Sequence, residues 1–160
     1  MNKALVIFHS QEYGNTELLA KAVFEGLNES GLETTLFNTN SGRFDVNKLS
    51  QYDCVAIGSP DYFGYLAGGI KQFVDDLYVA EVRKGIKGLT GKPYVLFFSY
   101  NSGNCKALDM RGIFKILGEQ VGEPLAFNGM IKSEAYTQCK SLGKTLALAY
   151  YDKLVDKLKE

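Results

Sequence analysis

Short apolar segments alternate with helical patterns along most of the chain, and this alternation limits the fold more than any other feature. Residues 4–8, 54–59 and 94–98 are almost wholly apolar, as is typical of strands buried on both faces of a sheet. Residues 32–37 are half polar, and residues 125–131 are interrupted by an Asn-Gly pair. We therefore expect the first of these segments to be an edge strand and the second to be an edge strand or a bulge.

Apolar residues spaced three or four apart predict helices between the strands. The predicted helices cover residues 19–27, 70–77, 110–121 and 142–158. Residues 39–50 form a polar connection, and residues 81–92 form a basic loop with three glycines. Strict alternation of strand and helix favours a parallel sheet with helices on both faces. The predicted fold class is α/β, a three-layer, doubly wound sandwich with a five-stranded parallel sheet.

The chain has 160 residues, a length that predicts one domain spanning residues 1–160. Its formal net charge is zero, which argues against a nucleic-acid binder that relies on a basic face. The N-terminal apolar stretch is too short for a signal peptide, and no apolar run is long enough for a membrane span. Three cysteines without a CxxC pair and a single histidine argue against a zinc site and suit a reducing compartment. We therefore expect a cytoplasmic protein without a metal site.

The neutral total conceals an uneven distribution of charge. Residues 1–80 carry five basic and ten acidic side chains, whereas residues 81–160 carry 13 basic and eight acidic ones. If the two halves form opposite edges of the sheet, these charges make a lateral dipole that can orient a partner.

Ligands of doubly wound sheets bind beyond the carboxyl ends of the strands, near the point where the strand order reverses. The first loop to examine is residues 10–16 (Ser-Gln-Glu-Tyr-Gly-Asn-Thr), which joins a buried strand to a helix start. Unpaired backbone N–H groups there favour an anion. The loop contains no lysine or arginine and matches neither GxxxxGK[ST] nor GxGxxG, so it suits a single terminal phosphate. An ordinary helix cap built from Asn15 or Thr16 is the alternative.

The second loop, residues 58–64 (Gly-Ser-Pro-Asp-Tyr-Phe-Gly), places two adjacent aromatic residues between Pro60 and Gly64. A planar ligand can stack on such rings, although a hydrophobic plug over the sheet is an alternative. The third loop, residues 99–104, adds Tyr100 and several small hydrogen-bonding groups that can clamp the far side of a ring.

With these loops, the chain resembles the flavodoxin-like flavoproteins, which bind flavin mononucleotide (FMN). The segment Ser10-Gln11-x-x-Gly14-Asn15-Thr16 is similar to their phosphate loop. The segment Gly58-Ser-Pro-x-Tyr62-Phe63-Gly64, followed by Gly69, Lys71, Phe73 and Asp75, is similar to their second flavin loop. The resemblance covers essentially the whole chain and implies the strand order 2-1-3-4-5.

The resemblance also implies which residues hold FMN, and it names no catalytic side chain. The phosphate and ribityl end would be held by Ser10, Gln11, Tyr13, Gly14, Asn15 and Thr16. The isoalloxazine ring would lie against Pro60, Asp61, Tyr62, Phe63 and Gly64. Its other side would be closed by Ser99, Tyr100, Asn101 and Gly103.

This sequence also departs from the family pattern. It has no tryptophan to stack on the ring, and Asp61 places a carboxylate where we expect a neutral residue. The third loop is not acidic, and the chain lacks the strong negative charge that typically steers redox partners.

The resemblance implies a redox protein that carries electrons between partners, as a monomer or dimer. The first alternative is an NAD(P)H-dependent reductase of quinones or free flavin, and the second is a flavin-free binding module. Two other classes fit less well. Residues 105–111 match the CX5R pattern of tyrosine phosphatases but lack the glycine-rich loop that this chemistry needs. A receiver domain needs paired acidic residues after the first strand, where His9 and Ser10 stand instead.

Overall fold

Five parallel strands form the central sheet of the computed structural model, which describes residues 2–160. Their order is β2-β1-β3-β5-β6. The strands are β1 (Lys3–Phe8), β2 (Glu33–Asn38), β3 (Cys54–Tyr62), β5 (Tyr94–Tyr100) and β6 (Leu125–Asn128). The predicted strand order and both predicted edge strands are confirmed.

A sixth strand, β4 (Tyr65–Leu66), was not predicted from the sequence. It pairs antiparallel with the end of β3, so that Asp61 faces Leu66 and Tyr62 faces Tyr65. The two strands are joined by Phe63 and Gly64, both with positive φ (56° and 73°). Positive φ at both central residues is the signature of a type I′ hairpin turn.

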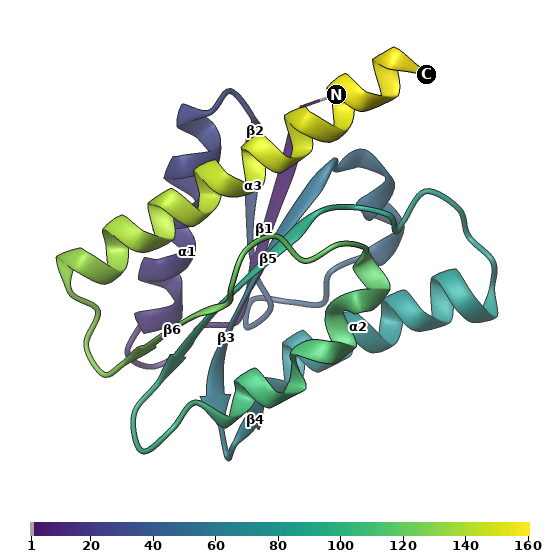
Figure 1. Ribbon diagram of the computed structural model, residues 1–160. Coiled ribbons are helices and arrows are strands. Elements are labelled where there is room, and N and C mark those ends of the chain that lie inside the picture. Colours follow the sequence, from purple (N-terminus) through teal and green to yellow (C-terminus); the bar gives the residue numbers. More distant parts are fainter. Residues whose placement is uncertain (1) are drawn as a thin grey trace.

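Helices cover both faces of the sheet, as Figure 1 shows. On one face lie α1 (Asn15–Glu29) and α3 (Ser133–Lys159), which pack on the alternate strand residues Ala4, Val6, Ala56 and Phe97. The other face is covered by α2 (Gly68–Tyr78), the π-helical turn η2 (Val79–Arg83) and two 3-10 helices, η1 (Val46–Gln51) and η3 (Lys106–Leu117). Because successive strand residues point to opposite faces, the near-continuous apolar strands supply two separate cores.

The predicted helix over residues 110–121 is wrong in type and length. The segment is the 3-10 helix η3, and it ends at Gly118, whose φ is 144°. A side chain at Gly118 would place its Cβ 2.4 Å from the carbonyl oxygen of Lys92. The chain then turns, and the N–H of Val121 donates to the carbonyl of Tyr94 in β5. A tertiary contact with the sheet therefore ends the helix before the apolar pattern does.

Residues 39–50 and 81–92 are also more structured than expected. The first contains the start of η1, whose Val46 and Leu49 are buried in the core. The second begins within η2 and contains Leu89, which is buried in the core. Each connection therefore contributes apolar side chains to the same core as α2.

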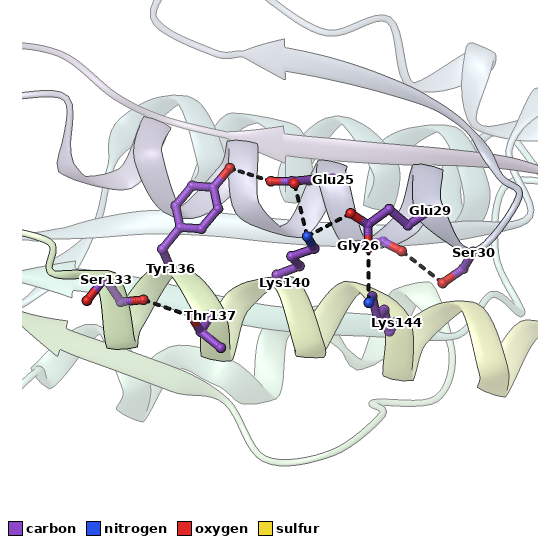
Figure 2. A network of polar contacts seen from close by, with 9 residues as sticks. All are labelled: Glu25, Gly26, Glu29, Ser30, Ser133, Tyr136, Thr137, Lys140 and Lys144. Atoms are coloured by element: carbon purple, nitrogen blue, oxygen red, sulfur yellow. Dashed lines mark hydrogen bonds and ion pairs between the residues drawn. The ribbon is translucent and has the colours of Figure 1, made fainter.

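Helices α1 and α3 are joined by a network of ion pairs (Figure 2). The Lys140 ammonium lies 3.0 Å from a Glu25 oxygen and 2.7 Å from a Glu29 oxygen, and Lys144 lies 3.0 Å from Glu29. The Tyr136 hydroxyl donates to Glu25 at 2.7 Å. Acidic groups of the first half thus pair with basic groups of the second half. The expected separation of charge to opposite edges is therefore wrong for this helix pair.

Candidate functional site

The carboxyl ends of β1, β3 and β5 meet at one edge of the sheet, where the structure has two adjoining cavities. The smaller has a volume of about 100 Å³ and lies on the first loop. The larger has a volume of about 420 Å³ and lies between the second and third loops. Asn101 lines both, and every residue that the sequence predicted for a cofactor site lines one or the other.

The smaller cavity is a cradle of backbone N–H groups whose lining contains no lysine or arginine and one carboxylate, that of Glu12. Its lining includes residues 10–16, together with Pro60, Tyr62, Ser99 and Asn101. Within residues 2–160, the N–H groups of Tyr13, Asn15 and Thr16 have no hydrogen-bond partner. The last two open α1, where unpaired N–H groups and the helix dipole favour an anion.

The alternative of a side-chain helix cap is not what the structure shows. The N-cap of α1 is Gly14, with φ of 71°, and no side chain caps the helix. Thr16 is buried, and its Oγ1 lies 2.8 Å from the Ser99 hydroxyl. Ser10 Oγ accepts the N–H of Glu17 at 3.3 Å. The hydroxyls of the first loop therefore stabilise the shape of the cradle and leave its amides available.

The larger cavity has aromatic walls. Phe63, at the tip of the β3–β4 turn, is fully exposed at 108%, and Tyr13, on the neighbouring cavity, is 84% exposed. Tyr100 also lines the larger cavity and is partly buried. A hydrophobic plug would bury the two aromatic rings of the second loop against the sheet, so that alternative is wrong for Phe63, whereas Tyr62 is partly buried. Exposed rings beside a cavity are suited to stacking on a planar ligand.

The turn that carries Phe63 is fixed by Asp61. One carboxylate oxygen accepts the N–H of Gly64 at 2.8 Å, and the other accepts the N–H of Ala107 at 2.9 Å. A non-glycine residue with positive φ is uncommon and is maintained by its surroundings. The two hydrogen bonds supply such surroundings for Phe63.

Lys106 is a site residue that the sequence analysis missed. It lines the larger cavity, and no ion pair to it is present in the described part of the chain. Its position directly after the third loop was the available signal. The cavity therefore has a positive charge as well as the predicted carboxylate of Asp61.

His9 is a packed residue at the end of β1. Its ring nitrogens lie 2.8 Å from Thr39 Oγ1 and 2.7 Å from Gln11 Oε1, and the ring is 8% exposed. It also contacts the edge of the Tyr62 ring, with 6.0 Å between centroids. Burial, together with the charge of Glu12, raises the pKa of Tyr62. His9 thus connects the first loop to the second and to the end of β2.

The cysteines are unsuited to nucleophilic chemistry. All three are free and buried. Burial raises the pKa of Cys54 and of Cys139 to about 12, and it also raises the pKa of Cys105. The CX5R pattern at residues 105–111 falls largely on η3 and forms no phosphate loop.

Residues 2–160 contain neither a metal-binding cluster nor a membrane-spanning helix. No group of histidine, cysteine, aspartate and glutamate is arranged to hold a metal ion. No helix there has the length and apolar character needed to cross a membrane.

A further cavity of about 410 Å³ lies on the far side of α2 and is lined by residues such as Arg43, Asp76 and Lys84. Arg43 is already engaged there, donating two hydrogen bonds to the Asp76 carboxylate at 2.8 and 2.6 Å. This cavity is a rival binding site in any experimental test.

The protein has a doubly wound α/β fold, and its paired cavities lie where such proteins bind ligands, beyond the carboxyl ends of the strands. The family model described as flavodoxin matches residues 6–142, and the chain belongs to this family. It is therefore a flavoprotein with a redox function.

Several curated relatives carry the name NAD(P)H dehydrogenase (quinone). "NAD(P)H dehydrogenase (quinone) 3" of Rhizobium meliloti is 27% identical over 157 residues, which are 86% of this chain and 74% of that protein. "NAD(P)H dehydrogenase (quinone)" of Archaeoglobus fulgidus is 35% identical over 98 residues, which are 47% of this chain and 51% of that protein.

Solved structures show the same fold. A flavodoxin from the domain Archaea superposes with a TM-score of 0.77 at 21% identity, covering 93% of this chain and 99% of that one. The flavodiiron protein from Giardia intestinalis also superposes with a TM-score of 0.77, at 24% identity, and the match covers 96% of this chain and 38% of that one. At these identities the superpositions support the three-layer architecture alone.

Proposed function

We propose that residues 1–160 form one domain that binds FMN noncovalently and carries electrons between redox partners. The observation that carries this proposal is the cradle of unpaired N–H groups beside a cavity lined by Phe63 and Tyr100. FMN has a single terminal phosphate at one end and a planar ring at the other, and it supplies the electron chemistry when bound.

The residues present fit this cofactor. The free N–H groups of Asn15 and Thr16 would receive the phosphate, assisted by the Thr16 hydroxyl. A cavity of about 100 Å³ without a lysine or arginine suits one phosphate better than the two of a dinucleotide. Phe63 and Tyr100 both line the larger cavity and would contact the ring.

Exposure of the walls favours a carrier over a closed active site. The β3–β4 turn has only two residues at its tip, and Phe63 is fully exposed. The hairpin therefore leaves the ring cavity open to solvent, so that a partner can approach the cofactor edge.

The names of the curated relatives favour a second candidate, an NAD(P)H-dependent reductase of quinones or free flavin. Both candidates use the same cavities and differ in the electron donor. In either case we propose that the protein acts in the cytoplasm as a monomer or dimer, and three free thiols are consistent with a reducing compartment.

The test is a visible spectrum of the protein after addition of FMN, followed by titration with NADPH without oxygen. We expect flavin absorbance to remain with the protein after gel filtration and to bleach slowly or not at all with NADPH. Rapid bleaching by NADPH would favour the reductase. Failure to retain FMN would contradict both candidates and leave the flavin-free binding module.

A further inference from the structure

One carboxylate joins the two walls of the larger cavity. Asp61 accepts the N–H of Gly64 in the hairpin turn and the N–H of Ala107 at the start of η3, 46 residues away in sequence. Both of its oxygens are thus committed to backbone N–H groups. The turn and the 3-10 helix cannot separate without breaking one of these charge-assisted hydrogen bonds.

Lys106 lies between these two anchored points. Its neighbour Ala107 is held by Asp61, and its aliphatic stem packs against Gly64. A Cβ added to Gly64 would lie 3.3 Å from Lys106 Cδ and 3.6 Å from its Cβ. The backbone and the stem of Lys106 are therefore both restrained, while its ammonium has no ion-pair partner in the described residues.

We propose that Asp61 is a positioning residue that holds the Lys106 ammonium at the ring cavity, where it stabilises the negatively charged, fully reduced flavin. This inference rests on the proposed function. Lys106 is exposed, but an unpaired cation lowers the energy of a nearby anion, and this effect is larger near a protein surface than in bulk water. The charge of Asp61 has the opposite sign, but both of its oxygens are directed at the N–H groups of the walls.

The first test is the midpoint potential for the second electron, measured by spectroelectrochemistry on the FMN-loaded protein. We expect Lys106→Gln to lower the equilibrium constant for uptake of that electron about tenfold, which corresponds to ~59 mV. Lys106→Arg keeps the charge and should remain near the unmodified protein. Lys115→Gln is the matched control, because Lys115 is an exposed lysine of the same 3-10 helix that does not line the cavity. Equal potentials for Lys106→Gln and the unmodified protein would overturn the role of the lysine.

The second test is a double-mutant cycle with Asp61→Ala. If Asp61 positions the lysine, the shift caused by Lys106→Gln should fall to less than half in the Asp61→Ala background. Independent charges would give the same shift in both backgrounds, and that result would overturn positioning. Asp61→Asn, which keeps one acceptor oxygen, provides a second background should the alanine variant fold poorly.

Hydrogen exchange tests, without any flavin, whether Asp61 clamps the hairpin turn to the start of η3 through its two hydrogen bonds. We expect the amide protons of Gly64 and Ala107 to exchange at least tenfold faster in the Asp61→Ala apoprotein. Unchanged exchange would overturn the clamp. If the unmodified protein retains no FMN, the proposed function and the role of Lys106 fail together, whereas the exchange rates still decide whether Asp61 holds the walls.

Discussion

Replacing Thr16 by valine removes one buried hydroxyl from the phosphate cradle and leaves the side-chain volume almost unchanged. Thr16 Oγ1 lies 2.8 Å from Ser99 Oγ, and Thr16 is 2% exposed. If the serine donates in this pair, the threonine proton is free to point into the cavity. A hydrogen bond to a charged group contributes about 1.5–3 kcal/mol. Because 1.4 kcal/mol is about a factor of ten, the Kd for FMN should rise roughly 10- to 150-fold.

A comparison of two flavins distinguishes a loss of phosphate binding from a general loss of flavin binding. Apoprotein is titrated with FMN and with riboflavin, which lacks the phosphate, and binding is followed by quenching of flavin fluorescence. We expect Thr16→Val to weaken FMN binding and to leave riboflavin binding within about twofold. Adding Asn15→Ala should weaken FMN binding further.

Thr137→Val is the matched control for this substitution. Thr137 lies on the exposed surface of α3, where its hydroxyl donates only to the Ser133 carbonyl. It should bind both flavins as the unmodified protein does. Unchanged FMN affinity in Thr16→Val, or an equal loss for both flavins, would refute the placement of the phosphate.

Three further predictions concern the scaffold. Gly143→Ala should lower the free energy of unfolding by about 3 kcal/mol in urea titrations, because its Cβ would lie 2.3 Å from the Val23 carbonyl oxygen. Gly112→Ala is the control and should leave this free energy unchanged, because no atom lies within 4 Å of the added Cβ. Lys140 lowers the pKa of Glu29, and Glu29 raises the pKa of Lys140. Their pairing therefore stabilises the fold at pH values above the usual glutamate pKa of about 4.5 and below the usual lysine pKa of about 10.5. Lys140→Met should therefore reduce stability at pH 7 and make little difference at pH 3, and an equal effect at both values would contradict the ion-pair account. Finally, a thiol reagent at pH 8 should label none of the three cysteines in the folded protein within minutes and all of them in urea; rapid labelling of the folded protein would be inconsistent with burial.

The strands, and which of them lie at the edges, followed from the apolar pattern of the sequence, whereas the full strand order followed from the family resemblance. Strands that are buried on both faces need continuous apolar segments, whereas the two edge strands need fewer apolar residues. The composition of each segment therefore distinguished the central strands from the edge strands. The first loop was also predictable, since a glycine followed by a helix start is a local signal. Thr16 and Gly14 therefore lie where the sequence placed them.

Features that depend on contacts distant in sequence were not predictable in this way. The β3–β4 turn depends on Asp61, whose second partner is 46 residues away. The end of η3 depends on close approach of Gly118 to Lys92, and no periodicity reports such a contact. The net charges of the two halves gave no warning that α3 returns over α1 and pairs its lysines with Glu25 and Glu29.

If FMN binds as proposed, it occupies the two cavities at the carboxyl edge of the sheet. Amide NMR spectra of ¹⁵N-labelled apoprotein, recorded during addition of FMN up to one equivalent, locate the bound flavin. We expect the largest chemical-shift changes on residues 10–16, 60–64 and 99–104. Changes centred on the rival cavity around Arg43 and Lys84, or no changes at all, would contradict this placement of FMN.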